Sequence, residues 1–197
     1  MGRLRYVAVA VVLLAAACGG DDALSMEEYY AAVEAETARY DQATDDISNA
    51  LNAQFESAIT EVTDAAAGAD DATLETLVAE LTETAVAATS AAFRLTGEQL
   101  DQFIATMDPL EPPDEVAAEH DEAVAALRAS RAAIDPTIES IKGVTTMEEL
   151  DPVLAGSAFA DSRRRLEASC RALEQAGNDN GLDVDLDCPG DDQPQSP

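Results

Sequence analysis

The chain has no tryptophan, and only four phenylalanines and four tyrosines occur in its 197 residues. Aromatic rings anchor many protein-binding hot spots and stack on the bases of single-stranded nucleic acids, so surfaces of either kind are expected to be scarce. Histidine occurs once and cysteine three times. One imidazole cannot build the usual transition-metal sites without several well-placed carboxylates or thiolates.

Basic residues are also scarce. Eleven lysines and arginines stand against 40 aspartates and glutamates, which gives a formal net charge of −29. Nucleic-acid binding is not expected, because phosphate recognition needs a basic surface, and anionic lipid headgroups would repel the chain as well. Acidic surfaces commonly keep a protein soluble. Binding of a cation or small solute at the acidic faces remains an alternative.

Catalytic motifs are missing too. The sequence contains no Walker loop, Gly-rich dinucleotide motif or nucleophile elbow. His120 lies among acidic residues, but the Glu-x-x-His pattern of di-metal bundles would need an acid at position 117, which is Ala117. We expect His120 at the edge of a helix seam, with a pKa raised by a neighbouring carboxylate. The sequence therefore predicts no enzyme activity and no cofactor.

The first 17 residues have the three parts of a secretory signal peptide. Arg3 and Arg5 precede an unbroken apolar stretch, Tyr6 to Leu14, and three alanines follow. The apolar stretch is shorter than the ~20 residues that a membrane-spanning helix needs. We expect residues 1–17 to direct export.

The next residues resemble the lipobox of bacterial lipoproteins. The stretch reads Leu14-Ala15-Ala16-Ala17-Cys18-Gly19. That family prefers leucine three residues before the cysteine, where this chain has Ala15. The resemblance implies cleavage before Cys18, attachment of diacylglycerol to its sulfur, and residence at the extracytoplasmic face of the cell membrane. In overall style the chain is similar to helical lipoproteins of actinobacteria. An ordinary secretory signal with a chance cysteine is the alternative.

Lipidation of Cys18 would leave Cys170 and Cys188 as a pair. An exported protein meets an oxidising compartment, so the two are expected to form a disulfide. Zinc is a poor alternative, because two cysteines without a nearby histidine supply half of a tetrahedral site at most.

Apolar residues recur with the seven-residue spacing of packed helices. This predicts an all-α protein, an up-down four-helix bundle with a disulfide-tethered C-terminal extended segment. Thr96-Gly97 is expected to break or kink the second helix, and Pro136 the third. The predicted helices run from the capping box of Ser25 and Glu28 to Gly68, from Asp71 to Met107, from Asp114 to Gly143, and from Ser157 to Ala176, with a second capping box at Thr146 and Glu149.

The region after the last helix carries two patterns. Gly177 to Gly181 is a cluster of turn residues, and Leu182, Val184 and Leu186 then alternate with aspartates as in an extended segment. The same region contains a degenerate calcium loop. Its candidate ligands are Asn178, Asn180 and Asp187.

The sequence thus divides into a signal peptide (1–17), a lipidated acidic spacer (18–24), a helical bundle domain (25–188) and a disordered tail (189–197). The predicted function is that of a non-enzymatic lipoprotein that binds or scaffolds another envelope component. Its expected partners are the membrane, through the lipid on Cys18, and an envelope protein.

Overall fold

The structure is a computed structural model that describes residues 24–188. The predicted signal peptide, Cys18 and the predicted tail lie outside these residues. The predicted all-α class is confirmed, since five helices and one 3₁₀ turn account for the described chain and none of it forms a β-strand. The elements are α1 (Met26–Ala66), α2 (Asp71–Met107), η1 (Asp114–Val116), α3 (Ala117–Lys142), α4 (Met147–Ala155) and α5 (Ala158–Asp179).

Both predicted capping boxes are confirmed. At the start of α1, Ser25 Oγ accepts a hydrogen bond from the backbone N–H of Glu28 at 3.2 Å, and the Glu28 carboxylate accepts one from the N–H of Ser25 at 3.1 Å. Hydrogen bonds from the side chain and the backbone of Ser25 to the carboxylate lower the pKa of Glu28. The cap of α2 lies one residue earlier than predicted, because Asp70 accepts from the N–H of Thr73 at 2.9 Å.

The predicted break at Thr96-Gly97 is wrong, because α2 runs through both residues. Gly97 is buried, and a β-carbon added there would lie 3.3 Å from Ile134 Cγ2 on α3. Glycine costs a helix interior about 1 kcal/mol relative to alanine. At this position it lets two helices approach closely.

The third helix also continues past its proline. Pro136 is exposed, while Ala133, Ile134, Thr137 and Ile138 beside it are buried. An interior proline costs a helix about 3 kcal/mol. Packing of the adjacent buried residues offsets this cost, as expected where tertiary contacts supply most of the helical stability.

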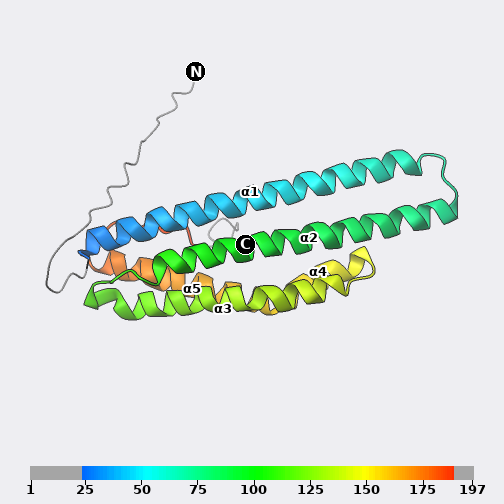
Figure 1. The fold of residues 1–197 in the computed structure, drawn as a ribbon. Helices are drawn as coiled ribbons and strands as arrows, with labels where there is room; N and C mark the ends of the chain where they lie inside the picture. The colour runs from blue at the N-terminus through cyan, green and yellow to red at the C-terminus, as the bar shows by residue number, and fades with distance from the viewer. Residues whose placement is uncertain (1–23, 189–197) are drawn as a thin grey trace, which may run out of the picture.

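The helices run back and forth along one axis (Figure 1). α1 packs on α2, α2 on α3, and α3 on α5. The main core lies near the start of α1, where Tyr29, Leu100, Leu127 and Leu173 are almost fully buried. A smaller cluster of Ala85, Ile141 and Leu150, with Phe55 packed against it, lies further along the bundle.

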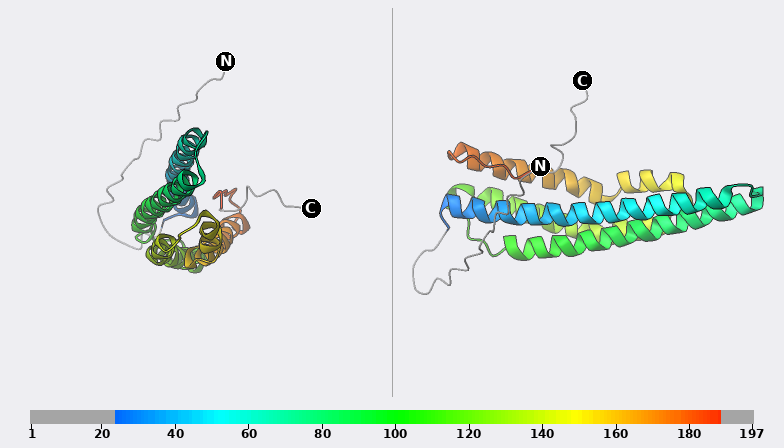
Figure 2. Two further views of the ribbon diagram at one scale, coloured as in Figure 1. Left: turned by 90° about the vertical axis from the view of Figure 1, so that its right-hand side faces the viewer. Right: turned by 90° about the horizontal axis from the view of Figure 1, so that it is seen from above.

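The first two helices extend beyond the others. α1 has 41 residues and α3 has 26, which correspond to about 60 Å and about 40 Å of helix. Figures 1 and 2 show the end of α1 and the start of α2 projecting past α3, α4 and α5. We call residues 56–84 the arm. Thr82 is its only buried residue, and no residue from 34 to 81 is buried.

The last helix is longer than predicted and takes in part of the expected turn cluster. Gly177, Asn178 and Asp179 form its final turn, and Gly181 alone has the left-handed backbone (φ +88°). A β-carbon at Gly177 would lie 2.7 Å from both Tyr30 Cζ and Val184 Cγ2. A larger residue would therefore clash at this position, because α1 and the C-terminal segment both pack closely against this turn.

Candidate binding surface

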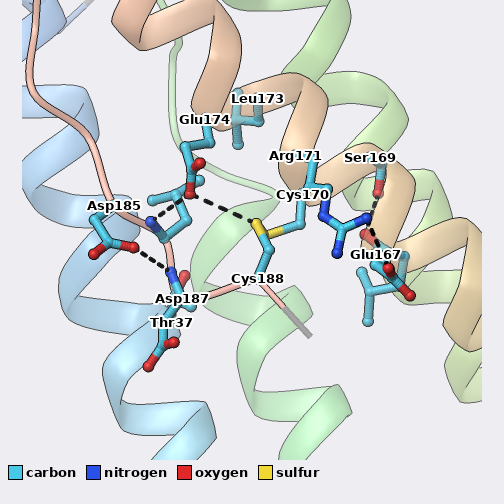
Figure 3. Close-up of a disulfide and its surroundings, with 12 residues drawn as sticks. Thr37, Glu167, Ser169, Cys170, Arg171, Leu173, Glu174, Asp185, Asp187 and Cys188 are labelled. Carbon is cyan, nitrogen blue, oxygen red and sulfur yellow. Dashed lines mark hydrogen bonds and ion pairs between the residues drawn. A yellow bond between two sulfur atoms is a disulfide. The ribbon is translucent and has the colours of Figure 1, made fainter. Parts of the chain in front are cut away.

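The C-terminal segment, residues 182–188, is fastened along α5. The predicted alternation is confirmed, since Val184, Leu186 and Cys188 are buried and the three aspartates between Leu182 and Cys188 are exposed. The predicted Cys170–Cys188 disulfide is confirmed as well. Glu174 accepts a hydrogen bond from the N–H of Leu186 at 2.9 Å (Figure 3).

Two of the three calcium candidates, Asn178 and Asn180, have other partners. The Asn178 side chain accepts from the N–H of Val184 at 3.0 Å and donates to its carbonyl at 3.2 Å. Asn180 donates to the carbonyl of Ala176 at 2.8 Å. Within residues 24–188 there is no group of three His, Cys, Asp or Glu residues that could hold a metal ion. The structure therefore assigns these side chains to turn and segment packing.

Asp41 on α1 faces the C-terminal segment. Burial raises its pKa to about 6, and the charges of Asp187 and Asp45 add to the effect. The folded state therefore binds a proton at this carboxyl between its ordinary pKa of 3.8 and about 6, and Asp41 contributes less stability as the pH rises through that range.

His120 lies in the core and not at a seam edge as predicted. It is 3 % exposed, and its Nδ1 lies 3.0 Å from the hydroxyl of Tyr29, with which it shares a hydrogen bond. The predicted rise in pKa is also wrong. Burial lowers the pKa of His120 and outweighs the opposing charges of Asp121 and Asp108. The imidazole is therefore a neutral core group at neutral pH.

This burial predicts an acid-sensitive contribution to stability. The unfolded chain protonates His120 below about pH 6.5, whereas the folded chain does so only at a lower pH. Stability from this group is complete above pH 6.5 and is lost as the pH falls toward the folded pKa. Urea unfolding between pH 8 and pH 5 should show a steeper acid loss for the native chain than for His120→Asn.

The comparison between variants is needed because Asp41 acts in the opposite direction between about pH 4 and pH 6. Both chains contain Asp41, so its contribution cancels in the difference between them. An asparagine at position 120 can accept a hydrogen bond from the Tyr29 hydroxyl, but its side chain does not titrate. Equal pH profiles for the two chains would contradict the placement of a neutral His120 in the core.

The arm carries three exposed apolar side chains, Ile59 on α1 and Leu74 and Val78 on α2, which we call the apolar stripe. Their exposed fractions are 53 %, 37 % and 56 %. On α2, Leu74 and Val78 precede Ala85 by about three and two helical turns, so these three residues lie on one face. Ala85 belongs to the smaller cluster, which includes Leu150 of α4. The stripe is therefore the uncovered continuation of a face that α4 covers further along.

The surroundings of the stripe are uniformly acidic. The arm contains eight acidic residues and no lysine, arginine or histidine, and the nearest basic residues along the chain are Arg39 and Arg94. A groove of about 520 Å³ also lies between the two helices of the arm, with Glu61, Glu80 and Leu81 among its lining residues. The arm is the candidate binding surface, because it combines several exposed apolar side chains with a charge of one sign.

The sequence analysis missed this surface. It predicted where α1 and α2 end, but it placed their whole length in a bundle. The available signal was the mismatch in helix length, together with the absence of basic residues from position 40 to position 93.

No protein-family model, curated protein or solved structure matches the chain. Within the described residues, no helix has both the length and the apolar character needed to cross a membrane.

Proposed function

We propose that this chain is a non-enzymatic cell-envelope lipoprotein that binds or scaffolds another envelope component. Residues 1–17 serve as the signal peptide, Cys18 carries the lipid, and residues 18–24 form a short spacer. The body is a four-helix up-and-down bundle in which α4 and α5 together make the fourth leg. The binding surface is the arm.

The observation that supports this function best is the position of the arm relative to the start of the described chain. Leu24 is held at the base of the bundle, where its backbone N–H donates to the carbonyl of Glu111 at 3.2 Å. The tip of the arm lies at the far end of α1, about 60 Å from Met26 along the helix. A lipid six residues before Leu24 would keep the base near the membrane and leave the arm free to reach a partner.

Replacing the anchor residue tests this proposal. We expect Cys18→Ala to release the protein from the membrane fraction, because the acidic body has no affinity of its own for anionic lipid. Intact-mass analysis of the membrane-extracted native chain should show the signal peptide removed and a diacylglycerol adduct at Cys18. The matched control is Cys170→Ser with Cys188→Ser, which should stay in the membrane fraction. A Cys18→Ala protein that remains membrane-bound would contradict the anchor.

Partner binding is tested separately by crosslinking on intact cells. The native chain should give a discrete crosslinked product, and peptide mapping should place the crosslink on the arm. Recovery of background proteins alone, or crosslinks confined to the base of the bundle, would contradict a binding role for the arm.

A further inference from the structure

We propose that the apolar stripe of the arm docks a basic amphipathic helix of a partner protein. This inference deepens the proposed function and rests on it for the presence of an envelope partner. It requires an apolar face that is built to be covered, a reason for a helical occupant, and a reason for positive charge on that occupant.

The stripe continues a face that is already a helix-packing surface. α2 presents Ala85 and Val86 toward the smaller cluster, where Ala85 is fully buried and Leu150 of α4 is 6 % exposed. About two turns before Ala85, Val78 is 56 % exposed on the same face. The covering helix, α4, does not extend over this part of α2, whereas the apolar residues of α2 continue beyond it. A further helix laid beyond α4 would cover the stripe in the same way that α4 covers its continuation.

The acidic residues around the stripe favour a positively charged occupant. Glu56 lies one turn before Ile59, and Asp71 and Glu75 lie one turn before Leu74 and Val78 respectively. No basic residue of the arm neutralises these acids. A helix with lysines or arginines beside its apolar face would therefore meet opposite charge near the stripe on both α1 and α2, which speeds association and excludes acidic competitors.

A second copy of this chain fits poorly. Two arms side by side would bring together eight acidic residues from each chain with no basic residue from either. Like charges across an interface cost several kcal/mol.

Segments of this chain outside residues 24–188 fit poorly as well. The apolar stretch nearest to Leu24 ends at Leu14, and ten extended residues span at most about 36 Å. Ile59 lies 33 residues beyond Met26, which is about 50 Å along α1. The tail after Cys188 carries two aspartates and no large apolar residue. Neither residues 1–23 nor residues 189–197 therefore supply the occupant.

The test uses the full chain in a non-ionic detergent, which also keeps a lipid-anchored form in solution. The probe is a helical peptide of leucine and lysine, about 18 residues long, whose leucines recur at the i, i+3, i+4 spacing of one helix face. Titration calorimetry should detect binding. A peptide of the same composition in scrambled order, and one with every lysine replaced by glutamate, should bind at least about tenfold more weakly.

Two double variants locate the contact. Ile59→Ser with Val78→Ser removes the stripe, and we expect it to weaken binding at least about tenfold. Leu95→Ser with Met147→Ser is the matched control, since these residues are 45 % and 36 % exposed and lie outside the arm. The control should bind like the native chain. All four residues are exposed, so circular dichroism should show unchanged helicity in both variants.

Three outcomes would overturn the inference. Equal binding by both double variants would mean that the peptide responds only to the overall negative charge. Equal binding of the scrambled peptide would mean that no helix face is recognised. A dimer in sedimentation velocity that the stripe variant abolishes would make a second copy the occupant. Each result is independent of the membrane-fraction assay for Cys18, so this inference and the anchor fail separately.

Discussion

Replacing Tyr29 with alanine is expected to lower the free energy of unfolding by about 3–5 kcal/mol, as for other large core aromatics. Tyr29 is fully buried in α1 and meets the ring of Tyr30 edge-on at 5.1 Å. Its hydroxyl shares a hydrogen bond with His120 of α3. Alanine would remove the ring that joins α1 to α3 and would leave the His120 nitrogen without its partner. Urea unfolding at pH 8, followed by circular dichroism, measures the change.

Tyr29→Phe separates the ring from the hydroxyl. It keeps the packing and leaves His120 Nδ1 unpaired in the core, which costs about 1–3 kcal/mol. The double variant Tyr29→Phe with His120→Leu should be less destabilised than the sum of its parts, because leucine cannot accept the hydrogen bond and the two native groups interact directly. Strict additivity would contradict the buried hydrogen bond.

Removal of the disulfide is the second large expected effect. Cys170→Ser with Cys188→Ser should lower the free energy of unfolding by about 3 kcal/mol, since the bond closes a loop over a sequence separation of 18. The C-terminal segment should also loosen, because the hydrogen bonds of Asn178 and Glu174 would then hold it without a covalent bond. Chemical denaturation of the oxidised native chain and of the double variant gives the comparison.

The loosening has its own readout. Val184, Leu186 and Cys188 are buried against the bundle only while the segment lies in place. Proteolysis of the double variant should therefore cut within residues 182–188 before the helices are attacked, whereas the oxidised native chain should resist. A native chain and a double variant of equal stability and equal protease resistance would contradict a stapling role for the disulfide.

The features that the sequence predicted well depend on residues close together in the chain or on the number of cysteines. The capping boxes need only a side chain and a backbone group three residues apart, and the disulfide followed from the odd cysteine. The errors at Gly97 and His120 concern contacts between elements. Gly97 is explained by Ile134 on another helix, and the burial of His120 by Tyr29, which lies 91 residues away in the chain.

The candidate surface was hidden for the same reason. Heptad spacing describes the apolar face of α1 and α2, but not how much of that face another helix covers. Exposure of Ile59 and Val78 depends on where α3 and α4 stop, and this is a property of the assembled bundle. The acidic composition of the arm was visible in the sequence, although its alignment with an uncovered apolar stripe was not.

The long first helix has a consequence for the way the protein opens. Its first turns are fixed by Tyr29, Tyr30 and Val33 in the core, and the next 48 residues of the chain contain no buried residue. Local unfolding is easiest where few apolar contacts must be broken. Amide hydrogen exchange along α1 should therefore accelerate from base to tip, so that one continuous helix behaves as a slowly exchanging root and a rapidly opening end.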